Sequence, residues 1–435
     1  PRVRGAELKV ASLSVRDVRF PTARAGDGSD ALNQGDYSAT YVTLVTEDGY
    51  TGHGLTFTNG RGNELCVAAV EALRRHVEGR ELDPLAEGMH GLVLDLTRDP
   101  QLRWLGPEKG ALHMATGAIV NAAWDLHARR ARRPLWRFLA ELQPEELVAA
   151  LDFSYVTDAL APEDAVALLR ERSEGKDARV AALVRDGFPA YTTSTGWIGY
   201  SDEKVRRLCR EALAAGWTAF KVKVGADLGE NLRRVSLVRE EIGPGRRLML
   251  DANQCWDVPE AIRQVSALAR FDPYWIEEPT SPDDVLGHAE IARAVAPVGV
   301  ATGETCPNRV VFKQLLAARA LSFVQVDACR MAGFSEALVV LLLAARAGVP
   351  VCPHGGGVGL CEYVQHLSFF DAAALGGAGD GRVCEYVDHL HEHFVDPCVV
   401  KRARYLAPEA PGTSIAILPE SLERFEFPGG AAWRD

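Results

Sequence analysis

Acidic residues recur at a regular interval after one pair of lysines. Lys221 and Lys223 lie in FKVKV, and Asp251, Glu277 and Glu304 follow in LMLDAN, YWIEEP and VGVATGE. The gaps from Lys223 onward (251 − 223, 277 − 251 and 304 − 277) are 28, 26 and 27 residues. Each gap is about the length of one strand, one helix and two short loops. We therefore expect one acidic residue at the end of each successive strand.

These three carboxylates could hold a metal ion. Side chains at the ends of barrel strands meet at the C-terminal mouth, where barrel enzymes place their chemistry. Carboxylate oxygens are hard ligands, and this set contains no Cys or His, so it favours Mg²⁺ completed by water and substrate oxygens. A single strand-end Asp or Glu is more often a helix cap or a solvated residue. Three in succession after a lysine pair weaken that alternative.

Two further groups could move protons. Lys221 and Lys223 are two residues apart, so they share one face of their strand. His354 in CPHGGGVG lies 27 residues after Asp327 in FVQVD, which places the two on neighbouring strand ends. A carboxylate beside an imidazole fixes its tautomer and raises its basicity, giving an acid/base pair. Alone, His354 would read as a core histidine.

Together these groups suit removal of a proton from carbon. A proton α to a carboxylate is a very weak acid, because its loss creates a dianionic enediolate. Mg²⁺ on the substrate carboxylate and a nearby cationic lysine would stabilise that charge. A lysine acting as the base must be neutral, and we expect a second lysine and a divalent cation to lower its pKa.

Two other motifs point to different chemistry. HGGG can form the oxyanion hole of an α/β-hydrolase, but the chain contains no GxSxG nucleophile elbow. His389, His391 and His393 alternate in DHLHEHF, as zinc-binding histidines on a strand would. They lie past the last predicted strand beside acidic residues, and we favour surface or packing roles for them. Glu385 ends that strand, where a capping role is as good an interpretation as a functional one.

Alternating strand and helix patterns run through residues 189–388. They imply right-handed βαβ crossovers and a parallel sheet, and eight strands favour a closed barrel. The expected strands are TTSTGWI, FKVKV, LMLDAN, YWIEEP, VGVATGE, SFVQVD, VPVCPH and RVCEY.

Residues 1–145 indicate a separate α+β module. Two β-rich runs within 37–57 meet at an Asp-Gly turn typical of a hairpin, and residues 8–20 add a third run. Helical spacing is expected over 63–78 and 108–140. This module precedes the barrel along the chain.

Three segments connect or extend these units. Residues 23–36 are rich in Gly and Asp and predict a mobile loop. Residues 146–188 form an insertion with a strand-like LVAALDFSYV and a charged helix over 162–186. Residues 389–435 carry Pro and Gly and predict an extended tail packed back on the body.

Composition bounds the class of protein. The 435 residues carry a net charge of −11, which argues against nucleic acid as a partner. The longest apolar run, Ala337 to Ala345, is too short for a membrane span, and no signal-peptide core is visible at the start. Nine cysteines without a CxxC pair fit reduced thiols. We expect a cytoplasmic enzyme without membrane or nucleic-acid partners, and a homo-oligomer.

The motifs together resemble the enolase superfamily, mandelate racemase subgroup, the standard case of a Lys or His base working with Mg²⁺. KVKV, the three carboxylates, and the Asp327 and His354 pair carry this resemblance. Longer segments resemble its L-fuconate dehydratase family: LSVRDVRFPT, GDYSATYV, QLRWLGPEKG, YTTSTGWIGYSD, DANQCWDVPEA, WIEEPTSPDD, CPHGGGVGLCE and CEYVDHLHEHF. The resemblance implies a modified TIM barrel of (β/α)7β type, with an N-terminal α+β capping domain that the C-terminal tail completes.

The resemblance also implies residue roles. Mg²⁺ would bind Asp251, Glu277 and Glu304. Lys223 would take the C2 proton, and His354, oriented by Asp327, would assist loss of the 3-hydroxyl or the later tautomerisation. The implied substrate-binding residues are Lys221 (for the carboxylate), Asn253, Glu304 and Glu385, with Gly28, Ser29, Asp30 and Tyr37 from a covering loop.

The implied activity is a hydro-lyase that converts an acid sugar, L-fuconate, to 2-dehydro-3-deoxy-L-fuconate. Dehydration or racemisation of another aldonate begins with the same proton abstraction, so the sequence leaves it open. A binding or regulatory protein with a relic site is a third alternative, against which the complete set of ligands and acid/base groups counts.

Overall fold

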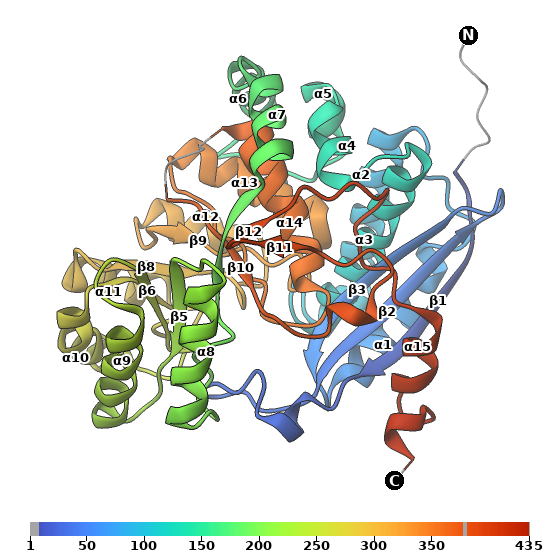
Figure 1. The fold of residues 1–435 in the computed structure, drawn as a ribbon. Coiled ribbons are helices and arrows are strands. Elements are labelled where there is room, and N and C mark those ends of the chain that lie inside the picture. Colours follow the sequence, from blue (N-terminus) through green and yellow to red (C-terminus); the bar gives the residue numbers. More distant parts are fainter. Residues whose placement is uncertain (1–7, 377–380, 435) are drawn as a thin grey trace.

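An antiparallel sheet and a ring of parallel strands make up the chain, which the computed structural model describes over residues 8–376 and 381–434. Residues 1–7 of the predicted cap, 377–380 of the predicted barrel and Asp435 of the predicted tail lie outside the described residues. Figure 1 shows the antiparallel sheet and α15 on one side of the molecule, with barrel helices α8 to α11 on the opposite side.

The capping domain packs its sheet on one long helix. Strands β1 (Val10–Arg19), β2 (Tyr37–Thr46) and β3 (Thr51–Asn59) pair antiparallel in that order. Helix α3 (Gly110–Arg130) is buried along most of its length. It approaches β3 so closely that a Cβ on Gly54 would lie 2.0 Å from the carbonyl oxygen of Ala118. Around it lie α1 (Asn63–Leu73), α4 (Leu135–Glu141) and α2 (Leu85–Thr97), of which the last was not predicted.

The second unit is the predicted modified TIM barrel of (β/α)7β type. Its strands are β4 (Phe188–Thr192), β5 (Ala219–Lys223), β6 (Arg247–Asp251), β7 (Pro273–Glu277), β8 (Gly299–Thr302), β9 (Phe323–Val324) and β10 (Cys384–Tyr386). They pair parallel in sequence from β4 to β9, and β10 pairs with β4. A single bridge from Val324 to Val351 stands at the remaining strand position.

A helix follows each of the first seven strand positions. These helices are α8 (Asp202–Ala214), α9 (Leu228–Ile242), α10 (Val258–Leu268), α11 (Val285–Val295), α12 (Arg309–Ala317), α13 (Gly333–Ala347) and α14 (Leu360–Phe370), which continues as a π-helical turn over Asp371–Leu375. Four of them begin at side chains that accept a backbone N–H. Ser201, Asp227, Asp284 and Asn308 are these caps, and each stabilises its helix by about 1 kcal/mol.

Three local predictions were wrong. LVAALDFSYV is not a strand: helix α5 (Pro144–Ala149) occupies its start, because Pro144 and two glutamates suit a helix N-terminus. The charged helix is two helices, α6 (Pro162–Glu171) and α7 (Lys176–Asp186), separated at Gly175 with φ +73°. The first barrel strand, β4, ends at Thr192, so TTSTGWI is mostly the loop that follows it.

The C-terminal segment runs from the barrel back to the cap. Strands β11 (Val400–Lys401) and β12 (Arg404–Tyr405) extend the barrel sheet, with β12 antiparallel to β4. Helix α15 (Pro419–Phe425) then lies beside β1, where the Phe427 N–H donates to the Asp17 carbonyl at 2.8 Å. This segment therefore touches both units.

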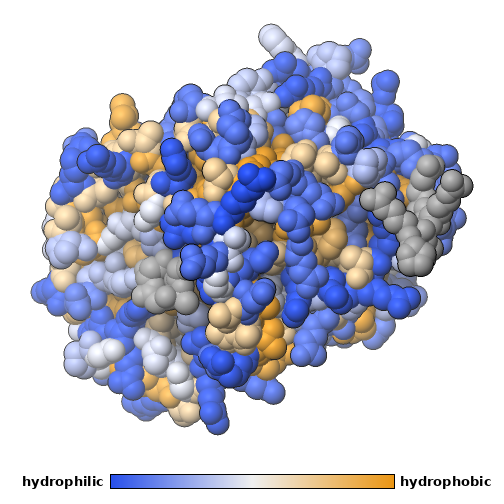
Figure 2. All heavy atoms as spheres, turned by 90° about the horizontal axis from the view of Figure 1, so that it is seen from above, coloured by the Kyte–Doolittle hydropathy of each residue, from blue (hydrophilic) through white to orange (hydrophobic). Residues whose placement is uncertain are grey.

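Within residues 8–376 and 381–434, no helix combines the length and apolar character needed to cross a bilayer. In the face of the molecule that Figure 2 shows, hydrophilic residues cover most of the surface and hydrophobic ones form scattered groups.

A buried ionic network joins the cap to the barrel. Glu336 of α13 accepts from His113 of α3 at 2.7 Å and from Arg309 of α12 at 2.8 Å. Arg309 also binds Glu108 at 3.2 Å and Asp152 at 2.9 Å. Burial alone would raise the pKa of Glu336, but His113 and Arg309 hold it well below its usual value. Glu336 is therefore a buried anion shared by three elements.

We predict that Glu336→Gln lowers the free energy of unfolding by about 3 kcal/mol, because buried Arg309 would lose one of its compensating charges. Denaturant unfolding monitored by circular dichroism measures this. The matched control is Glu211→Gln, which removes an exposed ion pair with Arg207 and should cost less than about 1 kcal/mol. Equal small losses in both variants would show that the network contributes little.

Candidate active site

The register of the barrel sheet brings the predicted metal ligands together. Lys223 pairs with Asp251, and Asp251 pairs with Glu277, across strands β5, β6 and β7. Glu304 follows the end of β8 by two residues. Oxygens of Asp251, Glu277 and Glu304 all lie within 4.8 Å of one another. Each residue therefore reaches the C-terminal end of its strand with its carboxylate turned to a common point.

Both predicted lysines point into this cluster. Lys223 Nζ lies 2.5 Å from Asp251 Oδ2. Lys221 Nζ lies 2.6 Å from Glu277 Oε1 and 2.7 Å from Glu385 Oε1, and it is fully buried. Since these contacts use the acidic side chains, the lysines offset the carboxylate charge inside the barrel.

The electrostatics of the cluster differ from one prediction. Burial lowers the pKa of Lys223, and Lys221 lowers it further, but the charges of Asp251, Glu304 and Asp30 together raise it well above its ordinary value. The expected lowering of the base's pKa is therefore not provided by the protein's own groups. It would require a cation that competes with Lys223 for Asp251.

The residues at the common point fit a hard divalent cation. Burial and the charge of Asp251 raise the pKa of Glu277 to about 8. The negative charge of the three carboxylates thus exceeds the positive charge of the two lysines. Glu304 Oε2 and Asn253 Oδ1 are buried without a hydrogen-bond partner. An all-oxygen set with unused oxygens is the ligand chemistry of Mg²⁺.

His354 and Asp327 form the predicted pair. His354 Nδ1 lies 2.9 Å from Asp327 Oδ2, and Nε2 lies 3.4 Å from Glu304 Oε2 without forming a hydrogen bond. Burial would lower the pKa of His354, but Glu304, Asp327 and Glu385 raise it to about 10. In the structure Nε2 accepts from the Gly356 N–H at 3.2 Å, a hydrogen bond that it gives up when it is protonated. The three carboxylates favour the protonated ring, which can then donate from Nε2.

A cavity of about 260 Å³ lies over the carboxylates and between the two units. Lys223, Glu304, Asp327, His354 and Glu385 reach it from the barrel. The complete lining is Gly28, Asp30, Leu32, Asn33, Tyr37, Phe57, Asn59, Trp197, Lys223, Gln254, Glu304, Thr305, Asp327, Arg330, His354, Gly356 and Glu385.

The predicted covering loop closes this cavity from the cap. Gly28, Asp30 and Tyr37 line it, and a Cβ on Gly28, at φ +75°, would lie 2.4 Å from the Tyr37 hydroxyl. Ser29 does not line it. Instead its Oγ accepts from the Gly199 N–H at 2.8 Å and fixes the loop to the barrel. Ser29 thus holds the loop in place without facing the cavity.

The remaining predicted residues lie beneath the cavity or at its edge. Lys221, Asp251, Glu277 and Asn253 are buried under its floor. Asn253 Nδ2 reaches Glu304 Oε1 at 3.5 Å. Glu385 lines the cavity and also accepts from the Gly355 N–H at 2.8 Å.

Several residues of the site were not predicted. Gln325 Nε2 donates to Glu277 Oε2 at 2.7 Å, and Arg330 Nε donates to the Glu304 carbonyl at 3.2 Å. Trp197, Gln254 and Thr305 line the cavity. Of these residues, Gln325 could have been predicted from the sequence, because it stands two residues before Asp327 and so lies on the same face of the strand.

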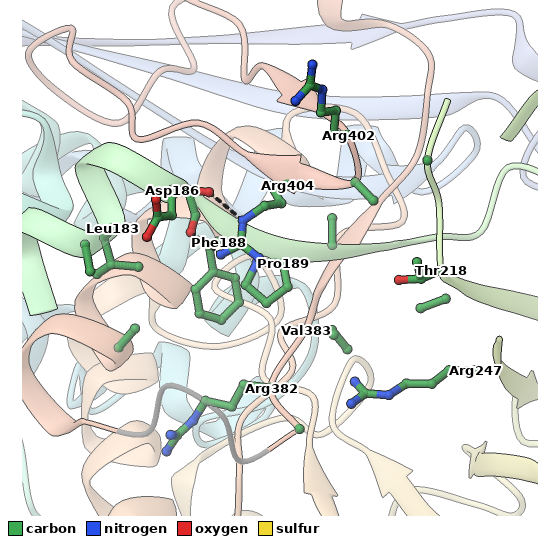
Figure 3. A pocket seen from close by; sticks show the side chains of 18 of the residues that line it. Leu183, Asp186, Phe188, Pro189, Thr218, Arg247, Arg382, Val383, Arg402 and Arg404 are labelled. Atoms are coloured by element: carbon green, nitrogen blue, oxygen red, sulfur yellow. Dashed lines mark hydrogen bonds between the residues drawn. The ribbon is translucent and has the colours of Figure 1, made fainter. Parts of the chain in front are cut away.

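A larger cavity, about 830 Å³, opens at the other end of the barrel, beside the first residues of β4, β5 and β6. Among the described residues that line it, Asp186 is the only acidic one and none is Lys or His. It therefore offers no lysine or histidine and no group of carboxylates for a metal, and we place the active site at the smaller cavity. Figure 3 shows the larger cavity, which Arg247, Arg382, Arg402 and Arg404 line from separate segments of the chain.

Comparison with known proteins identifies the family. Residues 204–421 match the family described as enolase C-terminal domain-like. The chain belongs to the enolase superfamily, which confirms the predicted superfamily.

Its relatives extend over the whole chain. Human mitochondrial enolase superfamily member 1 is 52% identical over 98% of this chain and 97% of that protein. Its crystal structure matches at 51% identity with a TM-score of 0.97, covering 98% of both chains. L-galactonate dehydratase of Hypocrea jecorina is 49% identical over 98% of this chain and 96% of its own length. The crystal structure of a racemase from Streptomyces coelicolor A3(2) with bound magnesium is 26% identical, with a TM-score of 0.74 over 96% and 99%.

We predict that Glu304→Gln weakens Mg²⁺ binding at least tenfold, because an amide oxygen replaces one of three anionic ligands. Isothermal titration of chelator-stripped protein measures the affinity. Glu260→Gln, the same change at a solvent-facing glutamate of α10, should leave Mg²⁺ affinity unchanged. An unaltered affinity in Glu304→Gln would remove it from the ligand set.

Proposed function

We propose that this protein is a Mg²⁺-dependent acid-sugar dehydratase that converts L-fuconate to 2-dehydro-3-deoxy-L-fuconate and water. One observation carries the proposal. Lys223 and His354 line a single cavity, and three carboxylates suited to Mg²⁺ lie together at its base, where Glu304 lines it and Asp251 and Glu277 are buried beneath. A base and an acid on one bound substrate are what elimination of water needs, because one group takes the C2 proton while the other protonates the departing hydroxyl.

In this proposal Asp251, Glu277 and Glu304 hold the metal. When bound, Mg²⁺ would withdraw charge from the substrate carboxylate and so acidify the C2 proton. Asp251 and Glu304, whose charges help to raise the pKa of Lys223, would then be shared with the cation, and the pKa of the lysine would fall. Neutral Lys223 then takes the C2 proton at Nζ.

His354 completes the elimination. Its imidazolium gives a proton from Nε2 to the 3-hydroxyl, the C3–O bond breaks, and water leaves. Asp327 holds Nδ1 and stabilises the charged ring before transfer. The enol left behind gains a proton at C3 and loses the proton of its C2 hydroxyl, which gives the 2-keto-3-deoxy acid. The loop over 23–36 excludes bulk water during these steps.

L-Galactonate is a second candidate substrate, because a relative at 49% identity over the whole chain is an L-galactonate dehydratase. L-Fuconate is its 6-deoxy analogue, so both present the same configuration at the reacting carbons. Leu32, Phe57 and Trp197 give the cavity apolar contacts that suit a terminal methyl group. A hydrophobic pocket rejects an added hydroxyl by only about 10²-fold.

We predict that Lys223→Ala abolishes turnover and stops C2 hydrogen exchange in deuterated water, while Mg²⁺ still binds. Loss of a positioned base costs about 10²- to 10⁴-fold in rate. Proton NMR follows the exchange, and titration calorimetry checks the metal. Lys401→Ala, an exposed lysine of β11, is the control and should retain full activity. Retained exchange in Lys223→Ala would assign the base elsewhere.

Substrate identity is tested by incubating the Mg²⁺-loaded protein with a panel of aldonates and assaying keto-acid formation. We expect L-fuconate to give the highest kcat/KM, with L-galactonate lower by about tenfold to a hundredfold. The reverse order would assign the protein as an L-galactonate dehydratase. C2 exchange without keto-acid would point to racemisation, and neither signal with metal bound would favour a binding protein.

A further inference from the structure

The three alternating histidines near the end of the barrel do not converge on one point. His393 Nδ1 meets Ser421 Oγ at 3.0 Å, and the His393 ring stacks on Phe20. The His389 ring lies against Tyr37. His393 Nε2 also lies 3.6 Å from Glu392 Oε1. Among the described residues, His391 belongs to a group of three possible metal ligands that includes neither of the other two histidines, so a zinc site built from the three histidines is not formed.

His391 belongs instead to a buried cluster outside the active site. His391 Nδ1 lies 2.7 Å from Glu362 Oε1 and 3.6 Å from Cys398 Sγ. One ligand atom from each of these three residues lies within 4.8 Å of the other two. Glu362 is 1% exposed and Cys398 is 7% exposed. A carboxylate, an imidazole and a thiol therefore share one water-poor position.

The hydrogen bonds of His391 leave room for a cation at this position. His391 Nε2 lies 2.8 Å from the Val387 carbonyl oxygen, which can only accept, so Nε2 carries its proton there. Nδ1 faces the Glu362 carboxylate, which also accepts. A proton of the imidazolium or of the Glu362 carboxyl completes this 2.7 Å hydrogen bond, and a metal ion bound to Nδ1 and Glu362 would replace that proton.

The surroundings are those of a metal-binding histidine. Such histidines donate their other ring N–H to a carboxylate or carbonyl group, which fixes the tautomer, as His391 does with Val387. The His391 ring also stacks on Tyr386 at an interplanar angle of 8°. Cys361 stands outside this group of three, since its Sγ lies 3.4 Å from the Gly355 carbonyl and accepts from the Val387 N–H at 3.5 Å. The chain therefore supplies three ligands at this position.

We propose that Glu362, His391 and Cys398 bind a zinc ion with a structural role. Thiolate, imidazole and carboxylate together select Zn²⁺ over Mg²⁺, because thiolate is a soft ligand. The burial of Glu362 and Cys398 keeps substrate away from this position.

Such an ion would tie the C-terminal segment to the start of α14. Glu362 lies in the first turn of that helix, directly after the loop that carries His354. His391 and Cys398 lie in the segment that runs on to the cap. The zinc site would thus brace the His354 loop from behind, without contacting the substrate.

The test uses the full chain, purified without chelator and held in excess Mg²⁺ so that the barrel site carries no zinc. Elemental analysis should find about one zinc per chain. After stripping and loading with Co²⁺, the protein should show a thiolate-to-cobalt charge-transfer band. The carboxylate site cannot produce this band because it contains no sulfur.

The matched variants are Cys398→Ser and Cys209→Ser, since both place a hydroxyl at a buried cysteine. We expect Cys398→Ser to lose the band and to bind zinc at least tenfold more weakly, and Cys209→Ser to keep both. The Co²⁺ spectrum of the unchanged chain decides the matter even where Cys398→Ser fails to fold. No band, or a Cys361 to Cys398 disulfide in the non-reduced peptides, would overturn the proposal.

Discussion

Charge balance at the mouth of the barrel is the constraint on which the active site depends. Three carboxylates and two lysines form close ion pairs, and Lys221 is fully buried among them. Isolated charges at such depth would be very costly. They are tolerated because each is paired, and the parallel register places Lys223, Asp251 and Glu277 at the same height. The fixed register of the sheet therefore positions the charged side chains of the site.

The same charge balance explains how one site can hold both an acid and a base. Glu304, Asp327 and Glu385 raise the pKa of His354, and Asp251 with Glu304 raises that of Lys223. A metal ion on Asp251, Glu277 and Glu304 would weaken this effect on both groups. Asp327 is outside the ligand set, so His354 would keep a carboxylate partner at 2.9 Å, whereas Lys223 would share its partner Asp251 with the ion.

The cap has to be held against the barrel for this chemistry to be shielded from water. Ser29 attaches the covering loop to the barrel at Gly199, and the ions around Arg309 and Glu336 join the two units farther from the cavity. The C-terminal segment makes a third connection, from β4 to β1. Three separate attachments allow a loop to lie over the site while the domains stay in register.

The sequence alone determined the barrel, the triad and the pair of His354 and Asp327, because strand and helix periods repeat locally and strand ends fall at fixed intervals. The cap sheet followed from its hairpin turn in the same way. Only the tertiary structure decided that Ser29 lies outside the cavity lining and that His391 meets Cys398 and Glu362. These depend on contacts between residues far apart in the chain, which local spacing does not encode.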